Sequence, residues 1–281
     1  MSTSPQPTRQ PAGAAPALGP FPSVPRVIYA QNPLREVICQ LRFPSILRIE
    51  AELPAAFQDR IRDVFPIYQE QSIPASPLAG LSLPAELMQL VEANFLGSQK
   101  PPYAFRSEDG QWSVTMAKDF IALATSTYQK WELFREYLDR PLQALEEIYK
   151  PAFYSRAGLR YRNVIRRSRL GLASNGWQDL LRNQLAGELA APEIADVIEK
   201  ANRQTLIKLP AFDSRVQVRH GLSLDNDETC YVIDNDFFAE HKTESSDVIG
   251  TLEYFNVQAH RLFRWFITDR LHEAMRPQPI S

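Results

Sequence analysis

Residues 154–169 read YSRAGLRYRNVIRRSR, a stretch with six arginines and no acidic residue. Its large apolar residues Leu159, Tyr161 and Ile165 fall at odd positions, whereas arginine recurs at even ones. Side chains alternate between the two faces of a β-strand, so the pattern predicts a strand from Tyr154 to about residue 165. We expect its apolar face to meet the core and its basic face to point away from it.

The basic face is the first candidate for a binding surface. Guanidinium groups stay ionised and offer forked donors that match phosphate, so a row of them can hold a polyanion. Alternatively, neighbouring strands can supply carboxylates that pair with these arginines, with Glu36 and the turn at 225–228 as sources. The third possibility is that the basic face binds a protein partner. The candidate binding residues of this segment are Arg156, Arg160, Arg162, Arg166 and Arg167.

Working outward from this strand, apolar periodicity predicts short strands and two long helices. The predicted strands cover residues 36–43, 103–107, 112–116, 120–125, 154–165, 205–209, 215–224 and 230–233. The predicted helices cover residues 54–65, 85–95, 128–149, 177–189 and 245–275. We expect a kink or break of the third helix at Pro141, and irregular structure over 66–84.

The order of these elements predicts an α+β fold, an antiparallel sheet packed by long helices. Residues 32–150 and 151–281 each run strand, helix, several strands, long helix, so the sequence indicates two pseudo-duplicated halves that share one compact unit. Residues 1–31 are rich in Pro and Ala and contain no acid, which is typical of a disordered tail.

Composition narrows the function classes. The 281 residues carry 31 Lys and Arg against 33 Asp and Glu, which gives a net charge of -2. The overall charge therefore gives no reason to expect binding to nucleic acid or to an anionic membrane. Cys39 and Cys230 lie in apolar runs and are expected to be buried free thiols. No signal sequence or membrane span is predicted, so we expect a cytoplasmic protein.

Motifs for metals, cofactors and catalysis are weak. Asp225, Asp227 and Glu228 form an acidic turn without the full calcium-loop pattern. The four histidines make no zinc motif, and the 11 glycines form no phosphate-cradling loop. The sequence therefore predicts no metal, no cofactor and no catalytic residue. Trp265, beside the apolar stripe of the last helix, is the best candidate for an exposed interface anchor.

Three blocks carry a resemblance to a known family. They are Pro33–Val37 with Leu41–Pro44, the stretch Trp112–Tyr128, and Gly158–Asn163. Together they resemble a sporadically distributed bacterial protein family of roughly 250 residues whose function is unknown. The likeness spans residues 32–275. Arg162 stands where that family more often has an apolar residue, and no site residue is implied by the resemblance.

Two functions follow as hypotheses. The first is a non-enzymatic binding or adaptor module that engages a protein partner, or else nucleic acid or another polyanion, through the arginine-rich strand face. The alternative is an enzyme acting on a phosphorylated or nucleic-acid substrate, with Arg160 and Arg162 holding phosphate. Asp234, Asp236 or His220 would then supply metal ligation or base chemistry, which requires these groups to share one cleft.

Overall fold

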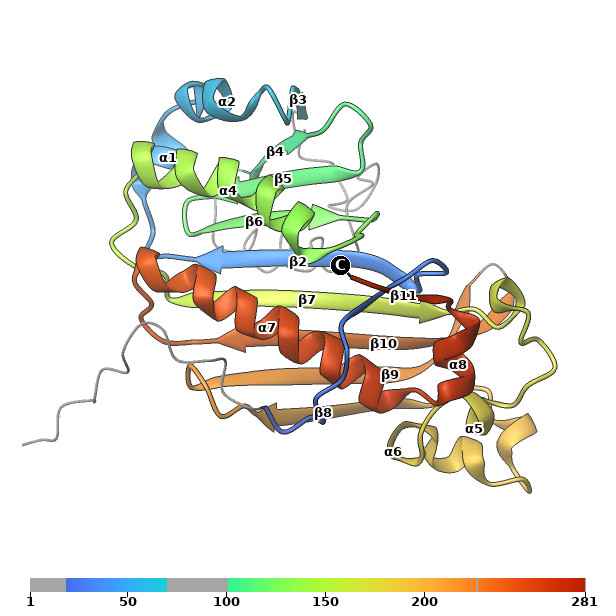
Figure 1. Ribbon diagram of the computed structural model, residues 1–281. Coiled ribbons are helices and arrows are strands. Elements are labelled where there is room, and N and C mark those ends of the chain that lie inside the picture. The colour runs from blue at the N-terminus through green and yellow to red at the C-terminus, as the bar shows by residue number, and fades with distance from the viewer. Residues whose placement is uncertain (1–18, 70–100, 226, 281) are drawn as a thin grey trace, which may run out of the picture.

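The computed structural model describes residues 19–69, 101–225 and 227–280. Its main feature is a nine-stranded antiparallel sheet in the order β3-β4-β5-β6-β2-β7-β10-β9-β8 (Figure 1). The strands of this sheet are β2 (Leu34–Arg42), β3 (Ile67–Gln69), β4 (Tyr103–Arg106), β5 (Trp112–Ala117), β6 (Phe120–Thr125), β7 (Arg156–Ile165), β8 (Asn202–Lys208), β9 (Ser214–Asp225) and β10 (Glu228–Ala239). The α+β prediction is confirmed.

The two halves of the chain meet in the middle of this sheet. β2 and β7, the first sheet strands of the two halves, pair antiparallel with each other. Beyond β2 lie β6, β5, β4 and β3, and beyond β7 lie β10, β9 and β8, so each half continues as a meander that runs back from its last strand. In each half the last strand of the meander thus lies next to the first strand, and the pseudo-duplication of the halves stays a prediction.

Two long helices cover one face of the sheet. α4 (Trp131–Ile148) lies over β4–β6, and α7 (Ser245–Phe266) lies over β7 and β10 (Figure 1). Their buried stripes include Phe134 and Leu145 on α4 and Phe255 and Leu262 on α7. α4 continues through Pro141, so the predicted kink does not end the helix.

Short helices fill the connections. They are α1 (Leu47–Ala51), α2 (Ala55–Ile61), η1 (Ser168–Leu170), α5 (Trp177–Leu180), α6 (Asn183–Ala186), η2 (Gly187–Ala190), η3 (Ala195–Val197) and α8 (Asp269–Ala274). The helix predicted over 177–189 is thus split into three short pieces. The helix predicted over 85–95 lies outside the described residues.

The predicted disordered tail extends too far. Val27–Tyr29 form β1, which pairs with β11 (Pro277–Pro279), and Phe21 is buried. We call residues 19–31 the strap, because they cross the outer side of α7 before entering β2 (Figure 1). The strap is ordered by contacts with distant parts of the chain, which its composition does not reveal. Residues 1–18 lie outside the described range.

The observed ends of one strand and one helix differ from the predicted ends for physical reasons. β10 runs to Ala239 rather than 233, because the acids that interrupt its apolar pattern pair with arginines of β7. The last helix ends at Phe266, where Ile267 adopts an extended conformation and bridges to Leu181. No helix among the described residues is long and apolar enough to span a bilayer.

Thr268 restarts the helix as the cap of α8. Its hydroxyl oxygen accepts from the Leu271 N–H, and the hydroxyl lies 2.7 Å from the Asp179 carbonyl oxygen. We expect Thr268→Ala to lower the free energy of unfolding by about 1 kcal/mol, the usual worth of such a cap, and Thr268→Ser to lower it less. Urea denaturation measures both, and equal losses in the two variants would contradict the capping role.

Candidate functional site

The arginine strand has the two faces predicted for it. Leu159, Tyr161 and Ile165 of β7 are buried on the helix side, and the even-numbered arginines lie on the opposite side of the sheet. The alternation is thus confirmed. What the guanidinium groups contact on that side decides whether they are available to a ligand.

Arg160 and Arg156 are engaged by acids of β10. Arg160 makes two hydrogen bonds to Asp234, one of them 2.6 Å from Nε to Oδ1, and only 15% of the arginine side chain and 8% of the aspartate side chain are exposed. Arg156 donates to Asp236 at 2.9 Å and to Gln40 at 3.2 Å. Its guanidinium folds over Gly158, where a Cβ would lie 2.2 Å from Nη1.

Arg166 and Arg167 are also held within the chain. Arg166 pairs with Asp225, and this pairing holds the pKa of the aspartate below its ordinary value. Arg167 donates to the Asn175 carbonyl oxygen at 2.6 Å and stacks over Trp177. Arg162 lies across the sheet from Glu36 on one side and Asp234 on the other.

These contacts give the arginine face a structural use. Alternating arginine and aspartate side chains on β7 and β10 neutralise one another in a half-buried setting, where a lone charge is costly. A binding role for Arg156, Arg160, Arg162, Arg166 and Arg167 remains a prediction, and a ligand would have to compete with the carboxylates already there.

Trp265 is 36% exposed, but part of its surface is used within the chain. Its ring lies 5.9 Å from that of Phe21 in the strap and 5.4 Å from that of Phe266. The indole therefore helps to fasten the strap to α7. Its predicted role as an anchor for another protein remains a prediction.

The groups required by the enzyme hypothesis do not converge on one face of the sheet. Asp234 is held by Arg160 on the arginine face, whereas His220 lies on the core face, where its Nδ1 is 2.7 Å from the Tyr231 hydroxyl and burial lowers the pKa of the imidazole. An open cavity of about 810 Å³ borders on Arg162, His220 and Asp234 but not on Arg160 or Asp236. Among the described residues no group of His, Cys, Asp and Glu is arranged to hold a metal ion.

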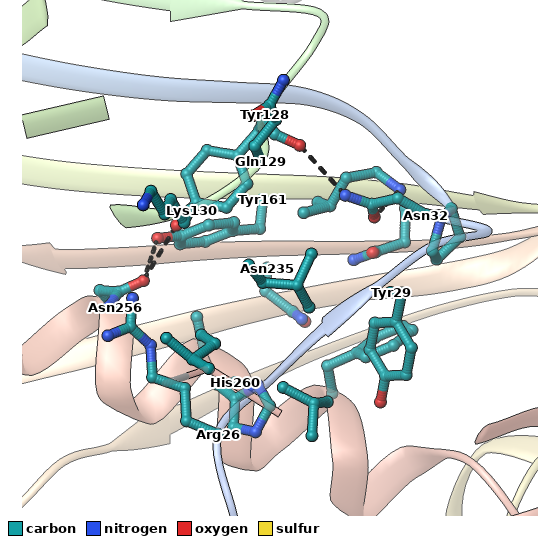
Figure 2. Close-up of a pocket in the computed structure, with 18 residues that line it drawn as sticks. Arg26, Tyr29, Asn32, Tyr128, Gln129, Lys130, Tyr161, Asn235, Asn256 and His260 are labelled. Atoms are coloured by element: carbon teal, nitrogen blue, oxygen red, sulfur yellow. Dashed lines mark hydrogen bonds between the residues drawn. The ribbon is translucent and has the colours of Figure 1, made fainter. Parts of the chain in front are cut away.

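A second, better enclosed site lies beneath the strap. This strap pocket, of about 90 Å³, is bounded by the strap, the connection before α4, strands β7 and β10, and helix α7 (Figure 2). Its lining is Arg26, Val27, Ile28, Tyr29, Asn32, Pro33, Leu34, Tyr128, Gln129, Lys130, Tyr161, Asn163, Asn235, Asn256, Ala259, His260, Phe263 and Ile280.

Hydrogen bonds fix the polar wall of this pocket. The hydroxyls of Tyr128 and Tyr161 both donate to Asn256 Oδ1, at 3.2 and 3.0 Å (Figure 2). Asn32 donates from Nδ2 to the Tyr128 carbonyl oxygen at 3.1 Å. The rings of Tyr128 and Tyr161 and the side-chain amide of Asn256 on α7 are thereby held in one orientation, as a pre-formed site requires.

Asn235 on β10 is the unusual residue of the wall. It is 1% exposed, and its Oδ1 accepts no hydrogen bond from any residue that the structure describes. A buried acceptor without a donor costs about 1–3 kcal/mol. Asn235 is one of the residues that line the strap pocket, although its Oδ1 is itself almost completely buried.

Several ionisable groups around the pocket make contacts within the chain, and Lys130, which also lines it, is exposed. Arg26 donates two hydrogen bonds to Glu132, at 2.6 and 3.0 Å, and this pairing lowers the pKa of the glutamate. Burial lowers the pKa of His260, whose Nε2 lies 2.9 Å from the Pro25 carbonyl oxygen. Burial raises the pKa of Tyr128 and Tyr161, so both hydroxyls keep their protons. None of the described lining residues is Asp or Glu.

Sequence reasoning missed the strap pocket, although one signal was present. Asn163 shares the odd-numbered, apolar face of β7, where an amide must find a partner or border a cavity. Asn235 occupies the same face of β10, directly across from Tyr161. A polar residue at a core-facing position of a strand was the available indication.

The Arg160–Asp234 pair gives a test of the structural reading. We expect Arg160→Met to lower the free energy of unfolding by about 3 kcal/mol, because it leaves a buried carboxylate, whereas Arg160→Met/Asp234→Leu recovers most of the loss. Arg60→Met is the matched control, since the Arg60–Glu147 pair is exposed and is expected to contribute under about 1 kcal/mol. Equal losses for Arg160→Met and Arg60→Met in urea denaturation would speak against a structural pair.

The strap attachment at His260 should depend on pH. The pKa of His260 is lower in the folded chain than in the unfolded one, so the unfolded state binds more protons and stability falls as pH drops below about 6.5. The free energy of unfolding at pH 5.5 should lie below that at pH 7.5, with a smaller difference in His260→Gln than in the control His241→Gln. Urea titrations at both pH values decide this, and an undiminished pH dependence in His260→Gln would count against it.

Comparisons with known proteins do not indicate a function for this chain. No protein-family model and no curated protein matches the chain. Among solved structures, the substrate-free duplicated taurocyamine kinase from Schistosoma mansoni aligns with a TM-score of 0.33 and 13% identity, over 81% of this chain and 33% of that one. The same kinase with bound transition state analog components gives 0.30 and 13%, over 81% and 32%. The chain spans about a third of these chains, and likeness this low carries no argument about fold or function.

Proposed function

We propose that this protein is a non-enzymatic binding module that holds a small polar ligand in the strap pocket. The observation that carries the proposal is the partly enclosed strap pocket with amide and tyrosine side chains in its wall, among them Asn235, whose Oδ1 has no donor among the described residues. Folding places this amide in the core at a cost, and a bound donor offsets that cost.

The lining supports a ligand of a particular chemical class. Amides and tyrosine hydroxyls provide the polar contacts, and Phe263 and Leu34 provide apolar ones. Arg26 is paired with Glu132, His260 is neutral near pH 7 because burial lowers its pKa, and Lys130 is an exposed residue of the lining, so little unsolvated charge faces the cavity. The proposed ligand is therefore a small uncharged molecule with N–H donors, such as a one-ring heterocycle or a simple amide.

Binding is favoured over catalysis by the state of the titratable groups. Tyr128 and Tyr161 donate to Asn256, and His260 is engaged with the strap backbone, so none of these groups is poised to move a proton. The alternative of an enzyme that uses Arg162, His220 and Asp234 is weaker, since Asp234 and His220 lie on opposite faces of the sheet and each has a partner within the chain. The proposal places the protein in the cytoplasm, in keeping with two buried free cysteines.

Asn235→Leu tests the proposal. Thermal unfolding is measured with uracil, nicotinamide and acetamide as probes, and we expect at least one to stabilise the wild type. At 100 times its dissociation constant a ligand stabilises by about 2.7 kcal/mol. Asn235→Leu should abolish this shift while leaving the ligand-free protein as stable as the wild type or more so, because an unsatisfied polar group is removed.

The control is Gln217→Leu, on the other face of the same sheet, which should keep the ligand response. Two results would contradict the proposal: no probe shifts the wild type, or the shift persists in Asn235→Leu. A marked loss of stability in ligand-free Asn235→Leu would indicate that the amide serves the fold alone.

A further inference from the structure

β8 forms one edge of the sheet and is open to pairing. No strand among the described residues pairs with its outer side, and six of its seven residues are exposed. The unpaired backbone groups of such an edge are a template for another strand. β3, at the other end of the sheet order, is only three residues long.

The residues of β8 do little to discourage such pairing. Natural edges are often blunted by charged side chains and proline, but Gln204, Thr205, Leu206 and Ile207 form an uncharged run in the middle of the strand. Leu206 is 57% exposed, a large apolar side chain at the centre of the edge. Arg203 is already paired with Glu188 within the chain.

We infer that β8 pairs antiparallel with β8 of a second copy of this chain, about a two-fold axis at Thr205. Such an isologous contact is the commonest route to a closed dimer. It joins the two sheets edge to edge and goes beyond the proposed ligand-binding function.

The sequence of β8 is self-complementary in this register. All seven residues find a partner, with Thr205 opposite itself, Arg203 opposite Ile207 and Lys208 opposite Asn202. No two like charges lie directly opposite, an arrangement that would be destabilising. The two Leu206 side chains become diagonal neighbours on one face, within reach of each other, and so cover apolar surface that is exposed in the single chain.

Other registers fit less well. Centring the pair at Leu206 leaves only residues 204–208 matched within the strand. A shift by one residue would place each side chain opposite one from the other face, which antiparallel pairing does not allow. The full-length register at Thr205 therefore makes the most backbone hydrogen bonds.

Thr205→Cys tests this register in the full chain. Directly opposed residues have Cβ atoms about 4.5–5.5 Å apart, close enough for a disulfide after a small adjustment. Diamide oxidation should convert this variant to a covalent dimer on a non-reducing gel. Lys208→Cys is the matched control, because two copies of residue 208 would lie six residues apart along the strands, about 20 Å. The native Cys39 and Cys230 are buried, so the wild type should stay uncrosslinked.

Sedimentation equilibrium measures the monomer–dimer equilibrium as a second, independent test. We expect the wild type to dimerise in the micromolar range and Leu206→Lys, which replaces an exposed residue, to weaken the dimer at least tenfold. A monomeric wild type at about 100 µM overturns the inference. So does a dimer that Leu206→Lys leaves unchanged, or equal crosslinking of Thr205→Cys and Lys208→Cys. Strap-pocket ligand binding is measured separately, so failure here leaves that proposal standing.

Discussion

The pairing of β2 with β7 is the contact on which the rest of the structure depends. It joins residues 34–42 to residues 156–165 and makes one sheet from two meanders that would otherwise each present an open edge. Both strands present apolar side chains toward the helices, including Val37, Leu41 and Leu159, so the pairing also aligns one continuous core. With this seam in place, α4 and α7 lie on the same face of the sheet (Figure 1).

The pairing of β2 with β7 also explains why the sheet can carry so much charge at its centre. β7 lies between β2 and β10, and its arginines meet Gln40 on one side and Asp234 and Asp236 on the other. Burial raises the pKa of Asp236, and Arg156 and Arg160 oppose that shift. A polar layer that is neutralised in place fixes the strand register, because a slip of one residue would bring arginines into the core.

The sequence predicted this architecture where the pattern is local and failed where order comes from distant contacts. Alternation along β7 gave both of its faces, and the apolar stripes gave α4 and α7. β10 was cut short because Asp234 and Asp236 look like a loop until their arginine partners are known. The strap was assigned to a disordered tail, since its anchors Glu132, His260 and Trp265 are more than a hundred residues away.

The strap pocket escaped prediction for the same reason, and its position follows from the seam. The pocket collects residues from the first half at Tyr128, from the second at Tyr161, Asn235 and Asn256, and from the strap that closes over them (Figure 2). Side chains on separate segments of the two halves, together with the strap, make up its wall. A core-facing asparagine is costly in a well-packed strand but is tolerable, and useful, where two halves leave a space.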